Sequence, residues 1–380
     1  MGRTVLNFLK KEIVLCVAGV LAIATAFVVH PSKAYIDYID FKVLALLFSL
    51  MLVVAGLKQM GVFTAIIKKL VGKVRTTRVI ELILVFMPFF AGMVITNDVA
   101  LITFVPFAIE LLQMIGRSRD IIYIVVLQTI AANLGSMATP IGNPQNIFLF
   151  TAFDMNMGEF LGTVMPYVVL SMAILAVCVC MIKSETITMG AGEGVKTDIK
   201  GIKLGLLAVI FVVCIACVAR VVDYRIMLAV AVVGIAIVDI RLFLKADYIL
   251  LITFVAFFIM IGNIRSIPEI SVRLSEIVQG REIAAGVISS QFISNVPAAV
   301  LLSSFTDNGR ALLAGVNIGG LGTIIASMAS LISFRIYGGM EGAAKGKFMG
   351  VFTALNLLFL IFMVIMAVVI TVFFKGVLTK

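Results

Sequence analysis

Long apolar runs constrain this chain more than any other feature of its sequence. A helix needs about 20 consecutive apolar residues to cross a bilayer, and residues 160–182 and 348–374 reach that length. Hydrophobic residues make up 62% of the chain and charged residues 13%, whereas soluble globular proteins have roughly one half and one quarter. We therefore expect an all-α, polytopic membrane protein.

The apolar pattern predicts how often the chain crosses the membrane. Amphipathic segments at residues 61–69 and 267–278 carry charges on one side and are predicted to lie at the membrane surface. Full crossings are predicted near residues 13–29, 41–57, 121–153, 160–182, 204–222, 226–240, 246–262, 310–336 and 348–374.

Two further apolar stretches do not fit simple crossings. Residues 79–114 and 283–305 are apolar on both sides of a short polar centre, at residues 96–98 in the first and 294–295 in the second. A polar centre between two apolar arms is typical of a chain that enters the membrane and returns to the same side. Each stretch is therefore predicted to be a re-entrant hairpin.

An internal repeat relates the two halves of the chain. Residues 133–146 align without a gap with residues 317–330, and the two hairpin centres also match. The hairpin precedes the aligned segment in both halves, an order that chance placement of polar residues would rarely produce. We expect two inverted repeats, each with one hairpin and one broken transmembrane helix. The predicted boundaries are 1–182 for the first repeat (hairpin about 79–114, broken helix about 121–153), 183–203 for a cytoplasmic linker, and 204–380 for the second repeat (hairpin about 283–305, broken helix about 310–336).

The positive charge of the chain follows its predicted topology. The formal net charge is +10, from 30 Lys and Arg against 20 Asp and Glu. If the chain is threaded from a cytoplasmic N-terminus, about two thirds of the basic residues fall on the inner side, as the positive-inside rule requires. This distribution explains the charge without nucleic acid as a partner. We expect a multi-pass protein of the cell inner (plasma) membrane, with the N-terminus in the cytoplasm and Lys380 outside.

The aligned segments contain the residue types that break a helix. Pro144 has no N–H to donate, and the Asn143 before it is pushed out of the helical region. Unwound backbone at membrane depth offers carbonyl oxygens to Na⁺, and half-helix N-termini offer N–H groups to an anion. The alternative is a kink in which Ser, Thr and Asn only join neighbouring helices. The candidate substrate-binding residues are Thr96, Asn97, Thr139, Pro140, Gly142, Asn143, Ser294, Asn295, Pro297 and Thr323, and the candidate Na⁺ ligands are Asn97, Asp98, Asn133, Asn143, Asn146, Asn295, Asn317, Ser327 and Ser330.

These motifs resemble a known group of transporters. The segments 95–106, 139–146 and 294–298 look like those of the ion transporter superfamily, in its citrate-transporter-like and arsenite-permease branches. The resemblance covers nearly the whole chain, which is also similar in layout to the divalent-anion/sodium symporters. It implies an elevator-type secondary transporter, often dimeric, with substrate between the hairpin tips and a cation site at each tip and broken-helix loop.

The hairpin centres depart from the symporter pattern, which has Ser-Asn-Thr in each hairpin. The first triplet here ends in Asp98 and the second in Val296. A carboxylate at Asp98 would repel a dianion, and an Asn-Asp pair looks more like arsenite permeases and Na⁺/H⁺ antiporters. A carboxylate inside a membrane is costly and therefore functional by default, as a cation ligand or proton carrier. The alternative is that Asp98 only caps the helix that follows it.

We expect a secondary active transporter that moves a small anion, a carboxylate or an inorganic oxyanion, coupled to Na⁺ or H⁺. The alternative transport function is Na⁺/H⁺ antiport or arsenite efflux. An enzyme is not expected, because the five cysteines lie in apolar spans and the single histidine has no metal cluster or base around it. A passive channel is not expected either, because channels usually repeat their pore elements around an oligomer axis, whereas this chain is predicted to carry two inverted broken helices. No cofactor is expected beyond the coupling ion, and the expected partners are the small anionic substrate, the lipid bilayer and a second copy of the chain in a homodimer.

Overall fold

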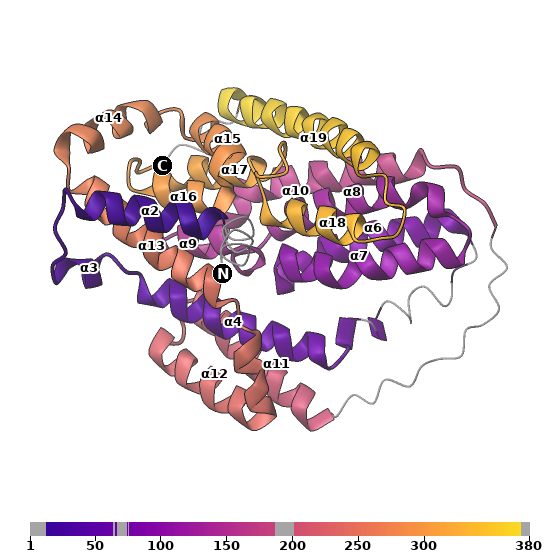
Figure 1. The fold of residues 1–380 in the computed structure, drawn as a ribbon, viewed down its shortest axis with the longest axis horizontal. Coiled ribbons are helices and arrows are strands. Elements are labelled where there is room, and N and C mark those ends of the chain that lie inside the picture. The colour runs from indigo at the N-terminus through magenta and orange to yellow at the C-terminus, as the bar shows by residue number, and fades with distance from the viewer. Residues whose placement is uncertain (1–12, 64, 67–73, 75, 187–200, 374–380) are drawn as a thin grey trace, which may run out of the picture.

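The computed structural model describes residues 13–63, 65–66, 74, 76–186 and 201–373 (Figure 1). Regular structure in these residues is helical, apart from one β-bridge between Thr76 and Thr186. The helices of the first half are α2 (Ile13–Ala26), α3 (Ala34–Asp37), α4 (Phe41–Gln59), α6 (Thr77–Ile95), α7 (Asn97–Met114), η1 (Ser118–Asp120), α8 (Ile121–Ser136), η2 (Pro140–Gly142), α9 (Pro144–Ala152) and α10 (Met157–Cys180). Those of the second half are α11 (Gly201–Val218), α12 (Tyr224–Asp239), η3 (Ile240–Lys245), α13 (Tyr248–Arg265), α14 (Pro268–Val278), α15 (Glu282–Ile293), α16 (Asn295–Ser303), α17 (Gly309–Ile318), α18 (Met328–Gly338) and α19 (Lys345–Phe373).

Eight helical segments of the described chain are long and apolar enough to cross a membrane. The prediction of an all-α polytopic protein is therefore confirmed. The segments are Phe41–Gln59, Thr77–Ile95, Asn97–Met114, Met157–Cys180, Gly201–Val218, Tyr224–Lys245, Tyr248–Arg265 and Lys345–Phe373.

Both predicted hairpins and both predicted helix breaks are present as backbone geometry. Helices α6 and α7 form the first hairpin and α15 and α16 the second, each joined by one residue. Residues 137–143 interrupt α8 and α9, and residues 319–327 interrupt α17 and α18. The opposite insertion of the two halves in the bilayer stays a prediction. Most of the predicted surface segment 61–69 and residues 187–200 of the predicted linker lie outside the described residues.

By their contacts the helices pack as two bodies, and in Figure 1 α4, α11 and α12 of the first lie below α6, α7 and α8 of the second. In the first body α13 lies along α2, α12 lies along α4, and α11 packs against both α4 and α12. The second body contains the two hairpins and the two broken helices, together with α10 and α19. The bodies meet mainly where α4 contacts α9 and where α13 contacts α16.

Glycines allow each hairpin to lie close against the first part of its broken helix. A Cβ added to Gly135 of α8 would lie 2.2 Å from the carbonyl oxygen of Phe89 in α6. In the second half, a Cβ on Gly315 of α17 would lie 2.8 Å from both the Cα and the carbonyl oxygen of Ile283 in α15. Small residues of this kind let helix backbones approach where the hydrophobic effect between helices is weak. The α6–α8 and α15–α17 pairs are thereby held as matching units.

Charged residues close the end of the first hairpin that lies away from its tip. The buried guanidinium of Arg117, just after α7, lies 2.6 Å from Asp120, 2.9 Å from Glu185 and 3.4 Å from Glu81 of α6. It also donates a hydrogen bond to the carbonyl oxygen of Lys183 at 2.9 Å. The hydrogen bond from Arg119 holds the pKa of the Glu185 carboxyl below its usual range. This cluster ties the chain after α10 to the base of the hairpin.

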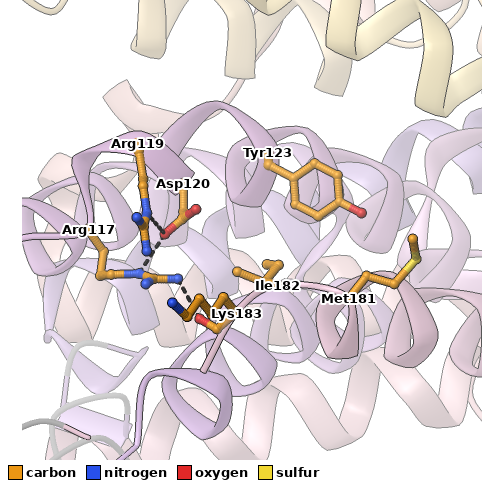
Figure 2. Close-up of a pocket in the computed structure, with 7 residues that line it drawn as sticks. All are labelled: Arg117, Arg119, Asp120, Tyr123, Met181, Ile182 and Lys183. Atoms are coloured by element: carbon orange, nitrogen blue, oxygen red, sulfur yellow. Dashed lines mark hydrogen bonds and ion pairs between the residues drawn. The ribbon is translucent and has the colours of Figure 1, made fainter. Parts of the chain in front are cut away.

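A cavity of about 420 Å³ lies at this cluster, at the end of the hairpin away from its tip. Figure 2 shows Arg117, Arg119 and Asp120 on one side of it and Tyr123 and Met181 on the other. Its two arginines are paired with Asp120 and Glu185. We therefore interpret it as a structural ion-pair cluster with an open surface, separate from the candidate binding residues at the hairpin tips.

The glycine contact predicts a large effect of a single methyl group. Gly135→Ala should lower the free energy of unfolding by about 1–3 kcal/mol, because the new Cβ forces α6 and α8 apart. The measurement is the apparent melting temperature of the purified protein in detergent. Gly162→Ala is the matched control, because Gly162 lies in α10 with no atom within 4 Å of the added Cβ. Equal melting temperatures for the two variants would contradict the close packing of α6 on α8.

Candidate functional site

Each hairpin turns at a single residue with an unusual backbone conformation. Thr96 has φ 65° and ψ 149°, and Ser294 has φ 70° and ψ 154°. This region is almost restricted to glycine, and other residues there cost of order 1–3 kcal/mol. Such residues persist where the surrounding structure holds them, often at ligand sites. Two strained hydroxyl residues with nearly the same dihedral angles therefore mark both tips.

The second part of each broken helix also begins in the same way in both halves. Asn143 precedes α9 with φ −144° and ψ 147°, and Ser327 precedes α18 with φ −142° and ψ 136°. Both residues are extended and buried. Pro144 follows Asn143 as the first residue of α9, a position where its missing N–H is no loss. In each half, one extended residue therefore stands directly before the second helix of the broken pair.

Four helix N-termini converge on one small cavity. Asn97 and Asp98 begin α7, Asn143 precedes α9, Asn295 begins α16 and Ser327 precedes α18, and all five line the cavity. Its volume is about 20 Å³, enough for about one water molecule or one small ion. The other lining residues are Pro144, Gln145, Leu250, Val296 and Met328.

Asn133 links the first hairpin to the loop of the second broken helix. Its Oδ1 accepts hydrogen bonds from Asn97 Nδ2 and from the Ser327 hydroxyl, both at 2.9 Å. Its Nδ2 donates to the carbonyl oxygen of Gly320 at 3.4 Å. One buried amide therefore contacts a hairpin tip and the opposite half of the protein at the same time.

Asn317, which matches Asn133 in the repeat, makes the reciprocal link. Its Nδ2 donates to Asn146 Oδ1 of α9 at 2.8 Å and to the carbonyl oxygen of Leu313 at 2.9 Å. Gln145 Nε2 donates to Asn317 Oδ1 at 3.5 Å. Asn146 in turn donates to the carbonyl oxygens of Ser136 and Thr139, at 3.3 and 3.1 Å. The two broken helices are thus hydrogen-bonded across the site.

Asp98 lines the cavity without capping a helix. Helix α7 has no side-chain cap, and the Asp98 backbone N–H donates to Asn97 Oδ1 at 2.8 Å. Asp98 Oδ1 is buried without a hydrogen-bond partner, and so is Asn143 Oδ1, and both residues line the cavity. Buried oxygen atoms without a donor are costly unless a ligand supplies one. The capping alternative therefore has no hydrogen bond behind it, and two residues with an open acceptor line a cavity of the size of one small ion.

The remaining candidate residues hold the loops in place. The hydroxyls of Thr139 and Thr323 donate to the carbonyl oxygens of Met93 and Gln291, which anchors each loop to its own hairpin. A Cβ on Gly142 would lie 2.0 Å from the carbonyl oxygen of Ser136, so Gly142 serves close packing. The buried Pro140 opens η2, Pro297 lines an adjoining cavity, and Ser330 is buried in α18 with its hydroxyl unpaired.

Two glutamines and one serine of this region were missed by the sequence analysis. Gln145 lines the cavity and stands inside the aligned segment, between Pro144 and Asn146. Ser136 accepts a hydrogen bond from Asn143 Nδ2 at 2.6 Å. Gln291 contacts the second loop through several bonds. A polar side chain inside an apolar hairpin arm was the signal for Gln291.

Comparison with known proteins identifies the family. The chain matches the model of the citrate transporter family over residues 4–308, which is most of its length. The chain belongs to the citrate transporter family. The resemblance drawn from the motifs is thereby confirmed, and the family is one of multi-pass membrane transporters, not of enzymes.

Two curated relatives cover most of the chain. An uncharacterized transporter of Methanocaldococcus jannaschii is 28% identical over 82% of this chain and 85% of its own length. The inner membrane protein YbiR of Escherichia coli is 28% identical over 82% of this chain and 83% of its own length. A silicon efflux transporter of rice is 29% identical over 44% of this chain and 34% of its own length. The similar proteins are thus transporters or membrane proteins by name.

Proposed function

We propose that this protein is a secondary active transporter that moves a small anion, a carboxylate or an inorganic oxyanion, with Na⁺ or H⁺ as the coupling ion. The observation that carries the proposal is the convergence of the N-termini of α7, α9, α16 and α18 on one cavity. Each N-terminus carries about half a positive charge. Four of them around one point favour an anion more than any other ligand.

The open acceptors in the same cavity support a coupling cation. Asp98 Oδ1 and Asn143 Oδ1 have no donor, and the cavity that both residues line has room for a small ion. Oxygen atoms of this kind are the ligands that Na⁺ takes in transporters with broken helices. No cluster of three His, Cys, Asp or Glu that could hold a transition metal occurs in the described part of the chain. A cation beside Asp98 would also reduce the repulsion between its carboxylate and an incoming anion.

The arm lengths of the second hairpin support a tip that lies inside the membrane. Helices α15 and α16 have 12 and 9 residues, or about 18 and 14 Å at 1.5 Å per residue. A hydrocarbon core is about 30 Å thick. An arm of this length that starts at one surface therefore ends within the bilayer. The arms of the first hairpin, α6 and α7, are long enough to cross, so their length alone does not place its tip.

The packing of two bodies supports an elevator mechanism. The cavity has room for one small ion only, so a larger anion needs the site to open. The hairpins and broken helices form one body that meets the other over few elements, chiefly α9 on α4 and α16 on α13. In our proposal this body moves as a unit, and the halves are inverted repeats with domains as predicted from the sequence. The protein would act in the plasma membrane as a homodimer, with a cytoplasmic N-terminus.

A second candidate function is efflux of a small oxyanion such as arsenite, or Na⁺/H⁺ antiport. The carboxylate of Asp98 in the cavity favours it, because a fixed negative charge there disfavours a dianion. The similarity of part of the chain to a silicon efflux transporter supports the same class of small substrate. The two functions would use the same cavity and would differ in which ion binds beside Asp98.

A ligand screen tests the proposed function. Thermal unfolding of the purified protein should shift upward with at least one of citrate, smaller carboxylates, sulfate, phosphate and arsenite, and more in Na⁺ than in K⁺ if Na⁺ is coupled. A ligand at 100 times its Kd stabilises the native state by about 2.7 kcal/mol. Asn97→Ala and Asn295→Ala should lose the shift, whereas Asn356→Ala, a buried amide of α19, should keep it. No shift with any anion would argue against anion transport.

Replacement of Asp98 by Asn separates the possible roles of its carboxylate. If Asp98 binds Na⁺, Asp98→Asn should weaken Na⁺ affinity more than tenfold, because a charged ligand is lost from a partly desolvated site. If it carries a proton, transport into vesicles should lose its pH dependence. Glu110→Gln removes an exposed carboxylate from the other end of α7 and should change neither property. Unchanged Na⁺ affinity and pH profile in Asp98→Asn would remove Asp98 from coupling.

A reversible cross-link between the two bodies tests the elevator mechanism. Arg220, between α11 and α12, lies 2.8 Å from Asp154, between α9 and α10, and donates to the Met155 carbonyl oxygen at 2.9 Å. In a chain without native cysteines, the pair Arg220→Cys and Asp154→Cys should lose at least 90% of its transport when joined by a reducible bifunctional reagent. Reduction should restore it, because the link joins parts that must move apart.

The control for the cross-link lies within one body. Arg310 of α17 and Glu159 of α10 also form an ion pair, and both belong to the body of the hairpins. Arg310→Cys with Glu159→Cys should therefore transport equally well with and without the link. If the Arg220→Cys and Asp154→Cys pair also transports normally when linked, the bodies do not move relative to one another at this point.

A further inference from the structure

The second broken-helix loop is organised around the side chain of Gln291. Its Nε2 lies 3.0 Å from the carbonyl oxygens of Gly319 and Leu321, and 3.1 Å from that of Val287. Two of these carbonyl oxygens belong to the loop after α17, and that of Val287 belongs to α15, the helix that carries Gln291. Carbonyl oxygens of an unwound segment are otherwise groups that can hold a cation.

The hydrogen bonds determine the orientation of this carboxamide. Gln291 Oε1 accepts the backbone N–H of Thr323 at 2.9 Å. A rotated amide would bring its oxygen against three carbonyl oxygens and its NH₂ against an N–H group, so only one orientation satisfies every atom. Gly322, with φ 102°, leaves the space that the carboxamide fills, since a Cβ there would lie 2.3 Å from Gln291 Oε1.

The first half differs at each matching position. Met93 stands where Gln291 stands, and its carbonyl oxygen accepts the hydroxyl of Thr139 as that of Gln291 accepts Thr323. A methionine side chain has no N–H to donate. Asn146 holds two carbonyl oxygens of the first loop, but Asp98 Oδ1 and Asn143 Oδ1 remain open.

Among the described residues of the second half, none that lines the cavity has such an open acceptor, since Ser330, whose buried hydroxyl is unpaired, is not part of the lining. Val296 stands where Asp98 stands in the first half and has no polar side-chain atom. Ser327 stands where Asn143 stands, and its hydroxyl already donates to Asn133 Oδ1 at 2.9 Å. A cation in the second loop would have to displace the Gln291 amide and would find no charged ligand. The residues of this half therefore do not fit the second cation site that the repeat and the family resemblance imply.

We propose that the carboxamide of Gln291 replaces a second coupling cation, so that the transporter uses a single cation, bound by the first half. The NH₂ group of the amide supplies the partial positive charge that a bound cation would otherwise supply to the loop carbonyl oxygens. Unlike a cation, it cannot dissociate. This inference rests on the proposed function, because it assigns its coupling stoichiometry. A glutamine that only stabilised the loop would make the same contacts, and it would leave the number of bound cations unaffected by its removal.

The test counts cations in the presence and absence of the amide. Wild-type protein should bind at most one ²²Na⁺ per chain, with a Hill coefficient of about 1. Gln291→Met, which copies the residue of the first half, should be less stable in choline chloride and should regain stability in NaCl with one additional Na⁺ bound, because free carbonyl oxygens then take a cation. Thermal unfolding and ²²Na⁺ binding in detergent, without any substrate, measure both effects.

Gln128→Met is the matched control. Gln128 is buried, and its Nε2 donates to the carbonyl oxygen of Leu84 at 2.8 Å, away from the cavity. Its loss should destabilise the protein equally in both salts. If Gln291→Met does not fold, Gln291→Glu keeps the shape and replaces the donor by an acceptor, and it should need Na⁺ more strongly than the wild type.

Three results would overturn the proposal. They are two Na⁺ per wild-type chain, a Gln291→Met protein with the Na⁺ response of the wild type, and a Gln291→Glu protein that is equally stable without Na⁺. A different result is expected if the proposed function is wrong and the protein is not coupled to Na⁺. In that case the wild-type protein binds no Na⁺, while the variants at Gln291 still bind one Na⁺ more than the wild type.

Discussion

The constraint on which this structure depends is that a bilayer offers no hydrogen bonds to the backbone. Two unwound segments in the body of the hairpins leave N–H and carbonyl groups that a helix would pair. Carboxamides resolve this, because one amide both donates and accepts. Asn146 holds the first loop and Gln291 the second, while Asn133 and Asn317 join the halves. A carboxylate could not donate at all, and a hydroxyl has only one proton to donate, whereas the NH₂ group of a carboxamide has two.

The same constraint explains why helix N-termini meet at the centre. A hairpin tip inside the body must reverse within one residue, and Thr96 and Ser294 do so in a strained conformation. The helices that follow then start at the tips, beside the starts of α9 and α18. Four positive dipole ends repel one another, and Asp98 in the first turn of α7 offsets part of that repulsion. A bound anion would further offset the repulsion between the four helix ends. A cation beside Asp98 would then keep the combined negative charge of the anion and the carboxylate from becoming too large.

Much of the backbone could be predicted from the sequence, because helix breaks and apolar arms are local properties. Pro144, the polar hairpin centres and the gapless alignment indicated the turns and breaks within a few residues of their positions. The roles of single side chains were harder to predict. The polar side chain of Gln291 stands out in an apolar arm, but its partners about 30 positions away are not indicated by the sequence, and neither is the close contact of Gly142 with the Ser136 carbonyl oxygen. The cluster around Arg117 likewise depends on three segments, at residues 81, 117–120 and 183–185, that meet only in the folded chain.

Comparison of the halves separates what the repeat keeps from what it changes. The backbone is kept: matching residues at the tips and before α9 and α18 have nearly equal dihedral angles. The side chains that decide charge are changed, with Asp98 against Val296 and Met93 against Gln291. In the proposed mechanism, a body that serves both sides of the membrane needs matching shapes at its two ends. It does not need matching chemistry, because an ion bound to one half moves with the whole body. The matching backbones of the two halves therefore suit the movement of the body. The side chains that differ between the halves can then determine which ion drives that movement.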